Sequence, residues 1–213
     1  MRYVKAKKER EIRRSSRDPF YFLTKHARTL DTHDKEHPIK HFPEKQYIKA
    51  MVDAWLDNPV LFIMKSRQIM ATWTFVGLNI WSAMFGGNEL IFFQSKREED
   101  AVGEEVAATG LLGRARFLIA HLPPWMMPQV EGPYNKLAFP KTNSLIWAVP
   151  QGGDILRSHT ASSVLSDEAT SQPEFPEAYT GSRPTITGGG RFTALSSVKG
   201  RDPFWQYCYG KVR

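Results

Sequence analysis

The chain has little of what marks secreted or membrane proteins. Its 213 residues include one cysteine, Cys208, so no intramolecular disulfide can form, and an intracellular compartment is favoured. No apolar stretch approaches the roughly 20 residues of a membrane span, and the basic N-terminus lacks the apolar segment of a signal peptide. The six histidines have no metal-ligand spacing, which argues against a zinc site. We expect a soluble protein that is not secreted and does not enter a membrane.

The chain also has fewer acidic than basic residues. The 29 Lys and Arg outnumber the 22 Asp and Glu, and the net charge of +7 favours an anionic partner such as nucleic acid. Residues 1–17 are crowded with basic side chains and have too few apolar ones to bury a face. We predict a flexible, solvated arm there, with contact to DNA or another protein as the alternative. At 41% hydrophobic residues the chain can form one substantial core, which we place in residues 18–213.

Short apolar runs alternate with longer segments of helical periodicity. Runs such as Val60–Met64 fit strands buried on both faces of a parallel sheet. The order strand, helix, strand, helix predicts an α/β domain with a central, mainly parallel sheet. The predicted segments are a helix over Glu44–Leu56, a strand over Val60–Met64, a helix over Thr72–Phe85, a strand over Leu90–Phe93, a helix over Glu98–Thr109, a hairpin of Leu137–Phe139 with Leu145–Trp147, and a last strand over Phe192–Leu195.

Two adjacent carboxylates, Asp167 and Glu168, end the apolar run that begins at Val164. At the tip of a buried strand, the first could hold magnesium, which prefers oxygen ligands and keeps several of its own waters. The second could orient or deprotonate an attacking water. A strand followed by an acidic helix cap gives the same pattern, so that alternative stays open at this point.

The loop after the first predicted strand, Lys65–Thr72, leads into a helix, as a phosphate-binding P-loop does. Such a loop needs backbone N–H groups around the phosphates, a lysine, and a hydroxyl that opens the helix and holds magnesium. Against the GxxxxGK[ST] pattern only Thr72 fits, because Met70 stands at the second glycine and Ala71 at the lysine. Thr72 would be the helix N-cap with or without a metal.

Together these segments resemble the large terminase subunit of tailed bacteriophages, the ATPase of the motor that packages viral DNA. In that family the loop commonly reads K-x-R-Q-x-G-x-[ST], with the lysine at its start in some members. Four residues match this variant, Lys65, Arg67, Gln68 and Thr72, while Met70 replaces the glycine.

Other matches follow in the family's order. Residues 18–22 and 38–46 are similar to the terminase lead-in, in which Gln46 would read the adenine edge. Residues 153–161 are similar to the segment before the strand that carries the catalytic glutamate, and Ser196 and Ser197 to the coupling motif. The resemblance spans about residues 18–205.

The resemblance implies a three-layer P-loop (ASCE-type) NTPase fold and a Mg-dependent ATPase that drives double-stranded DNA into a procapsid. It implies ATP and Mg²⁺ as cofactors, and as partners the DNA, a portal protein, a small terminase subunit and further copies in a homo-oligomeric ring, a pentamer, in the host cell cytoplasm. The implied ATP-binding residues are Gln46, Lys65, Ser66, Arg67, Gln68, Ile69, Met70, Ala71 and Thr72. The implied metal ligands are Thr72 and Asp167, the catalytic residues Glu168, Arg67 and Arg157, the last supplied to a neighbouring subunit, and the coupling residues Ser196 and Ser197.

Simpler roles stay open for several of these residues. Lys65 could be a solvated loop residue, Arg67 could form a structural ion pair, and Gln46 and Arg157 could be surface residues. Large terminases normally carry a second, RNase H-like nuclease domain, and 16 residues follow Ser197, so we expect the ATPase part alone and no DNA cleavage. Two other functions also stay open: a helicase-like P-loop ATPase, and a DNA- or portal-binding module whose loop has decayed through Met70 and Ala71.

Overall fold

A computed structural model describes residues 2–67, 69–197 and 200–210. Its centre is a six-stranded sheet in the order β3-β8-β7-β4-β6-β5, in which β5 alone runs antiparallel to its neighbour among these strands. A two-stranded antiparallel sheet of β1 and β2 lies outside it. The strands are β1 (Arg28–Leu30), β2 (Ile39–His41), β3 (Val60–Met64), β4 (Leu90–Gln94), β5 (Lys136–Phe139), β6 (Ser144–Val149), β7 (Ser163–Asp167) and β8 (Arg191–Ser196). The predicted mainly parallel sheet is confirmed.

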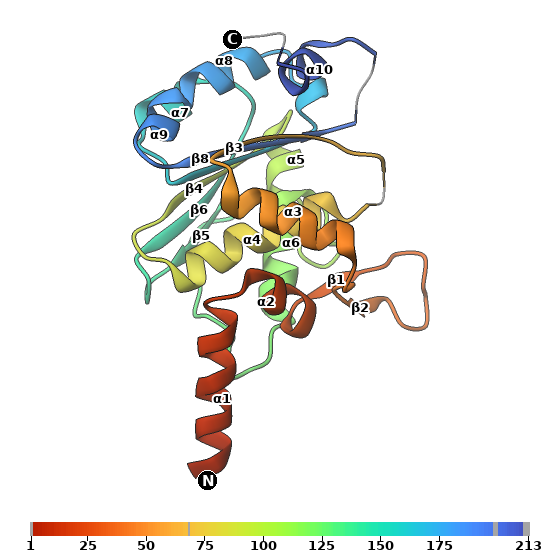
Figure 1. Ribbon diagram of the computed structural model, residues 1–213, viewed down its shortest axis with the longest axis vertical. Coiled ribbons are helices and arrows are strands. Elements are labelled where there is room, and N and C mark those ends of the chain that lie inside the picture. The colour runs from red at the N-terminus through yellow and green to blue at the C-terminus, as the bar shows by residue number, and fades with distance from the viewer. Residues whose placement is uncertain (1, 68, 198–199, 211–213) are drawn as a thin grey trace.

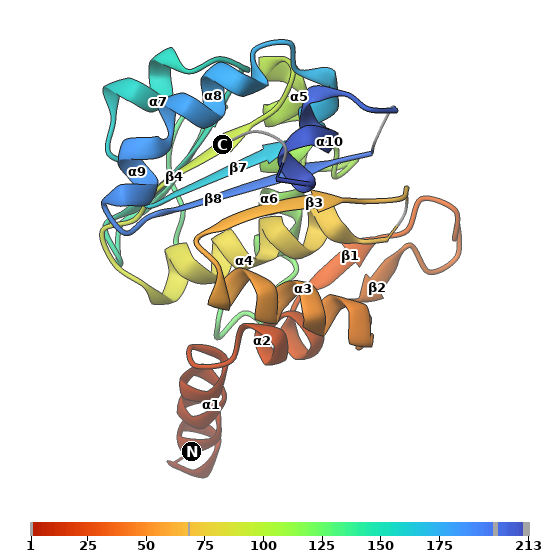
Figure 2. The ribbon, with the colours of Figure 1, turned by 45° about the horizontal axis from the view of Figure 1, so that its top comes forward.

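Helices cover both faces of the large sheet (Figures 1 and 2). One face carries α2 (Pro19–His26), α3 (Gln46–Asp57), α4 (Ala71–Phe85) and α6 (Gly110–Ala120), and the other carries α7 (Asp154–Ser158), α8 (Phe175–Gly181), α9 (Arg183–Thr187) and α10 (Pro203–Cys208). In β4, Ile91 and Phe93 belong to the core on the first face, while Phe92 belongs to the core on the second. Because successive strand residues point to opposite faces, a continuous apolar run is what a strand between two helical layers requires. The predicted three-layer architecture is confirmed.

The strand before the Lys65 loop differs from our expectation in its surroundings. Val60–Met64 is a strand with the predicted bounds, but β3 lies at the edge of the sheet and its residues are half-buried or exposed. Leu61 and Ile63 pack against the core on one face and Phe62 against the core on the other, so both faces are covered, but burial is incomplete at the open edge. An apolar run does not reveal whether a strand has one neighbour or two. Its one neighbour is β8, with Met64 opposite Ser196.

The predicted helix over Glu98–Thr109 is also wrong in its length. Only α5 (Glu98–Val102) forms, and the chain then turns at Gly103, whose φ is +64°. A Cβ on Gly103 would lie 2.0 Å from the carbonyl oxygen of Thr109, so the backbone closes on itself there. Helical structure resumes only at Gly110, where α6 begins. The other predicted segments agree with the observed ones to within about two residues, as helix boundaries generally allow.

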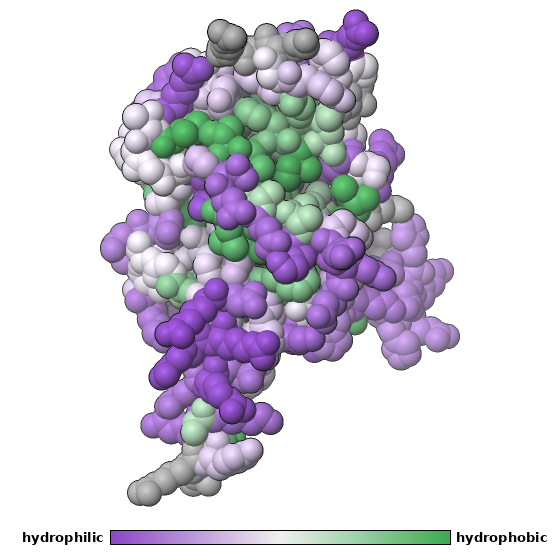
Figure 3. Space-filling model, in the orientation of Figure 1, coloured by the Kyte–Doolittle hydropathy of each residue, from purple (hydrophilic) through white to green (hydrophobic). Residues whose placement is uncertain are grey.

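Residues 2–15, where we predicted a flexible, solvated arm, form a helix, α1 (Arg2–Ser15). Most of α1 is exposed and projects from the body, where Figure 3 shows mainly hydrophilic residues. Its C-terminal turn is attached to the body, since Trp81 Nε1 donates to the carbonyl of Ser15 at 2.7 Å. The segment is rich in Lys, Arg, Glu and Ala, which are good helix formers. Helix propensity therefore accounts for α1, which has no apolar face that hydrophobic periodicity could have revealed. Whether α1 is flexible stays a prediction.

No helix among the described residues is long and apolar enough to span a bilayer.

Candidate active site

A cavity of about 1340 Å³ opens at the carboxyl ends of β3 and β7. In a parallel sheet these ends share one edge, which is where open α/β sheets bind ligands. The cavity collects residues from several parts of the chain, among them the loop after β3, the tip of β7, the β1–β2 hairpin and α6. The predicted residues that line it are Lys65, Ser66, Arg67, Ile69, Met70, Ala71, Thr72, Asp167, Glu168 and Ser197.

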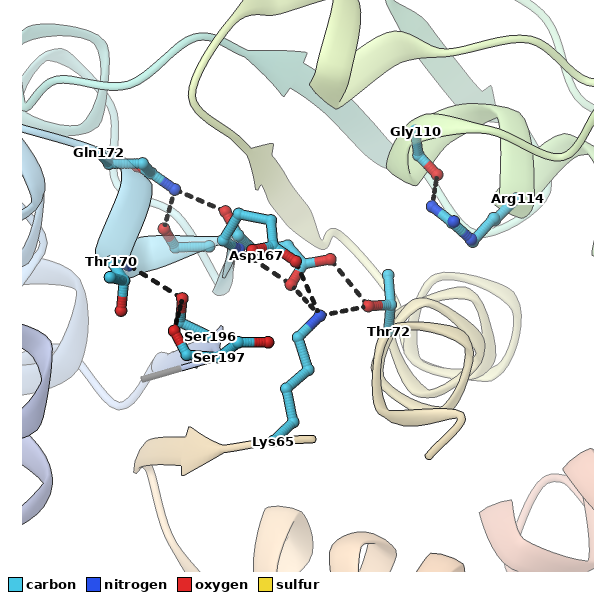
Figure 4. A network of polar contacts seen from close by, with 11 residues as sticks. Lys65, Thr72, Gly110, Arg114, Asp167, Thr170, Gln172, Ser196 and Ser197 are labelled. Atoms are coloured by element: carbon cyan, nitrogen blue, oxygen red, sulfur yellow. Dashed lines mark hydrogen bonds and ion pairs between the residues drawn. The ribbon is translucent and has the colours of Figure 1, made fainter. Parts of the chain in front are cut away.

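Lys65 connects the two motifs that the sequence placed far apart (Figure 4). Its Nζ donates to Asp167 Oδ1 at 2.7 Å and to Thr72 Oγ1 at 2.9 Å, and Thr72 Oγ1 donates to Asp167 Oδ2 at 2.8 Å. The side chains of Lys65 and Asp167 are only 10% and 9% exposed. The alternative of a solvated loop lysine is therefore wrong. We call the set of Lys65, Thr72 and Asp167 the lysine–aspartate network.

Backbone contacts hold the loop after β3 in place. The N–H of Lys65 donates to the carbonyl of Ser196 at 2.9 Å, which continues the ladder between β3 and β8. At the other end Met70 has φ +60° and ψ 9°, a left-handed conformation, and its carbonyl accepts the N–H of Thr74 at 2.9 Å to start α4. Met70 thus adopts, at a steric cost of roughly 1–2 kcal/mol, the conformation for which glycine is usual. The left-handed conformation at this position therefore forms without glycine.

Thr72 does not have the capping role that we predicted. Helix α4 begins at Ala71 with Met70 as its N-cap, so Thr72 lies inside the first turn. Its hydroxyl is used by Asp167 and Lys65 and makes no side-chain cap. The residue is positioned by the helix and contributes its oxygen to the cavity.

Glu168 stands beside this network at the tip of β7. Its Oε1 lies 3.4 Å from Lys65 Nζ, and its side chain is 49% exposed. The backbone of Glu168 is left-handed, with φ +54°, and its N–H donates to Asp167 Oδ1 at 2.9 Å. Strained backbone of this kind costs about 1–3 kcal/mol and is found most often at functional sites. The turn sends Asp167 into the buried network and leaves the Glu168 carboxylate accessible in the cavity.

Ser196 is placed between the two motifs. It is fully buried, and besides its carbonyl contact to Lys65 its Oγ accepts the N–H of Thr170 at 3.0 Å. Thr170 belongs to the short 3₁₀ helix η1 (Ala169–Ser171) that follows Glu168. Ser196 therefore contacts the beginning of the Lys65 loop and the segment after Glu168 at once.

Two predicted residues of the described chain, Gln46 and Arg157, are not brought into the cavity. Gln46 is exposed at the first position of α3 and is not among the lining residues. Arg157 lies on α7 and forms an exposed ion pair with Asp154 at 3.2 Å. Gln68 lies outside the described residues. Arg67 does line the cavity, and within the described part of the chain it forms no ion pair.

Among the charged lining residues that sequence reasoning missed is Arg114 on α6. Its Nη1 donates to the carbonyl of Gly110, and its guanidinium carbon lies 5.7 Å from the centre of the Trp73 ring. Burial lowers the pKa of Arg114, and the negative charges of Asp167 and Glu168 partly offset this. The signal in the sequence was the helical spacing of Leu111, Ala115 and Leu118, which puts Arg114 on the buried side of a helix that we had not predicted.

The oxygen atoms of the network fit a magnesium ion better than a metal with nitrogen or sulfur ligands. Thr72 Oγ1 and Asp167 Oδ2 lie 2.8 Å apart, and the Lys65 ammonium binds beside them, so this oxygen pair already holds a cationic group. No group of three His, Cys, Asp or Glu side chains able to hold a metal occurs among the described residues. Magnesium does not need one, because it keeps several waters and takes phosphate oxygens as ligands.

The fold and the position of the site define the class of protein to which this architecture corresponds. A strand, β8, lies between the strand that leads into the lysine loop and the strand that ends in Asp167 and Glu168, and the whole is a P-loop NTPase fold of the ASCE type. No family model and no curated protein matches the sequence.

Solved structures identify the fold more narrowly, as that of phage large terminase ATPase domains. The large terminase ATPase domain of Thermus phage P74-26 matches with a TM-score of 0.62 and 15% identity, over 78% of this chain and 69% of that one. The large terminase of bacteriophage HK97 matches with a TM-score of 0.67 and 12% identity, over 92% of this chain and 40% of that one. The chain thus spans less than half of the HK97 protein, and the predicted resemblance is confirmed in the fold.

Proposed function

We propose that this chain is the ATPase motor domain of a viral large terminase and couples ATP hydrolysis to translocation of double-stranded DNA into a procapsid. The observation that carries the proposal is the lysine–aspartate network with Glu168 beside it. A cation, a hydroxyl and a buried carboxylate converge on one cavity at the carboxyl ends of parallel strands, next to a second, accessible carboxylate. This is the set of groups that phosphoryl transfer to water requires.

In the proposed site ATP lies over the loop Lys65–Thr72, with its phosphates toward the N-terminus of α4. Thr72 and Asp167 hold magnesium, which when bound neutralises charge on the phosphates. Lys65 and Arg67 supply positive charge to the phosphate oxygens. Glu168 orients and deprotonates the attacking water, a role that suits its accessible carboxylate.

Ser196 and Ser197 are proposed to transmit the state of the nucleotide. A phosphate that draws the Lys65 side chain away from Asp167 would also shift the Lys65 backbone. That backbone is hydrogen-bonded to the carbonyl of Ser196, so the shift would reach Ser196. Because Ser196 also holds the segment after Glu168, such a shift reaches both sides of the site. This arrangement supports the coupling role that the resemblance implies.

The proposed partners are double-stranded DNA, a portal protein, a small terminase subunit and further copies of the chain in a pentameric ring, within the host cell cytoplasm. The net charge of +7 and the exposed basic helix α1 support an anionic partner. In the ring, Arg157 would reach the nucleotide of the neighbouring subunit, which fits its place outside its own cavity. That this chain does not cut DNA stays a prediction, which nicking of plasmid DNA would contradict.

The test compares Mg²⁺-dependent ATP binding and turnover in the parent and in Glu168→Gln. We expect Glu168→Gln to bind ATP like the parent and to lose turnover, because the amide cannot accept the proton of water. Lys65→Ala and Asp167→Ala should both weaken binding. Turnover that survives in Glu168→Gln would remove Glu168 from this role. Absence of ATP binding in the parent, with salt-sensitive binding to duplex DNA retained, would instead favour the non-catalytic binding module.

A helicase-like ATPase is distinguished by its response to nucleic acid. Turnover stimulated by single strands would favour that function, whereas stimulation by duplex DNA together with a portal or procapsid would support packaging.

A further inference from the structure

Arg114 brings a further positive charge into the cavity from α6, on an element other than those that carry the lysine–aspartate network (Figure 4). Lys65 already has three partners there, Thr72, Asp167 and Glu168, whereas Arg114 forms no ion pair with any described carboxylate. Of its five N–H donors, one reaches the carbonyl of Gly110, and its Nε is buried with no hydrogen-bond partner in the described structure. A guanidinium in this position has donor capacity for an anionic ligand.

The backbone around α6 gives Arg114 a defined position. The next residue toward the N-terminus, Gly113, packs so closely on the preceding turn that a Cβ would lie 2.5 Å from the carbonyl oxygen of Glu104. Gly110 packs in the same way on Gly103, because a Cβ on Gly110 would lie 2.6 Å from the nitrogen of Gly103. Because α6 is held against this turn by backbone contacts, the guanidinium is presented to the cavity from a rigid element.

Electrostatics indicate which part of a ligand would meet this guanidinium. Asp167 and Glu168 line the same cavity as Arg114, and their charges partly offset the effect of burial on its pKa. Arginine stays protonated at neutral pH even when burial lowers its pKa, and its planar fork fits phosphate oxygens in a bidentate way.

We propose that Arg114 is a phosphate-binding residue that acts in cis, contacting the terminal phosphates of the nucleotide from the α6 side while Lys65 contacts them from the β3 side. The inference rests on the proposed ATPase function. It differs from the proposed role of Arg157, since Arg114 serves the nucleotide of its own subunit.

The experiment measures displacement of a fluorescent ATP analogue by ATP, ADP and AMP, with magnesium, for the parent, Arg114→Gln, Arg114→Lys and the control Arg116→Gln. Arg116 is on the same helix but binds the carbonyl of Tyr134 outside this cavity. We expect Arg114→Gln to weaken ATP binding roughly 10–100-fold, as loss of one or two charge-assisted hydrogen bonds does. Arg114→Lys, which keeps the charge and loses the fork, should fall between Arg114→Gln and the parent. The affinity for AMP should be unchanged in all variants, and Arg116→Gln should match the parent.

The outcomes separate this inference from the proposed function. If the parent binds ATP and Arg114→Gln binds it equally well, the inference fails while the ATPase proposal stands. If Arg114→Gln weakens ATP, ADP and AMP equally, with a lowered unfolding temperature, the role is structural and the inference also fails. If the parent itself binds no ATP, the proposed function fails and takes the inference with it.

Discussion

The lysine–aspartate network predicts a strong energetic coupling between residues 102 positions apart in the chain. Both charged side chains are about nine-tenths buried, so removing one leaves the other desolvated without its partner. Breaking a buried ion pair in this way costs about 3–5 kcal/mol of unfolding free energy, which for a chain of this length corresponds to a fall in Tm of about 6–20 °C. We expect such losses for Lys65→Met and for Asp167→Asn.

The double variant, Lys65→Met with Asp167→Asn, should be less destabilised than the sum of the two. With both charges removed no charge is left buried, so a coupling energy of about 1–3 kcal/mol is expected from the cycle. In Asp167→Asn the Glu168 carboxylate, 3.4 Å from Lys65, still faces the lysine. The loss of unfolding free energy in this variant should therefore lie near the lower end of the expected range.

The assay is equilibrium denaturation by urea of the four proteins without nucleotide. The matched control is the exposed pair of Lys25 and Glu44, which lie 2.9 Å apart with side chains 47% and 63% exposed. The cycle of Lys25→Met with Glu44→Gln should give a coupling energy of at most about 1 kcal/mol, as is usual for exposed ion pairs. Additive effects at Lys65 and Asp167 would refute the buried ion pair and, with it, the geometry on which the proposed function depends.

Three further predictions test the backbone and the pH dependence. Met70→Gly should be more stable than Met70→Ala by about 0.5–1 kcal/mol in denaturant unfolding. Glycine adopts the φ of +60° without the steric cost that alanine has, and the greater entropy of glycine in the unfolded chain offsets part of this gain. Equal stability of the two variants would argue against strain at Met70. Gly113→Ala should lose about 1–3 kcal/mol through the contact with Glu104, whereas Gly87→Ala, whose nearest Cβ contact is 3.9 Å away, should not. Burial lowers the pKa of His26, with Arg28 acting in the same sense and Glu11 in the opposite one, so its contribution is present above pH about 6.5 and is lost as the pH falls below that value. His26→Gln should therefore flatten the pH dependence of unfolding by at most about 1.4 kcal/mol per pH unit, and an unchanged slope would exclude His26 as its source.

Much of the sheet could be predicted from local pattern. Runs such as Leu90–Phe93 must be strands between two apolar layers, because their residues supply both cores in alternation. The tip of β7 could be predicted for the same reason, since Asp167 and Glu168 end an apolar run. Local pattern failed where backbone geometry decides, as at Gly103, and where propensity without an apolar face suffices, as in α1.

For the candidate site too, local sequence predicted some features and tertiary structure decided the others. The sequence by itself determined that Lys65 and Thr72 flank a loop between a strand and a helix, and that two carboxylates end another strand, because these are properties of neighbouring residues. Only the tertiary structure decided that Lys65 reaches Asp167, that Arg114 enters the same cavity, and that Gln46 does not. Such contacts depend on the strand order and on the packing of helices on the sheet, which join parts of the chain that no local pattern relates.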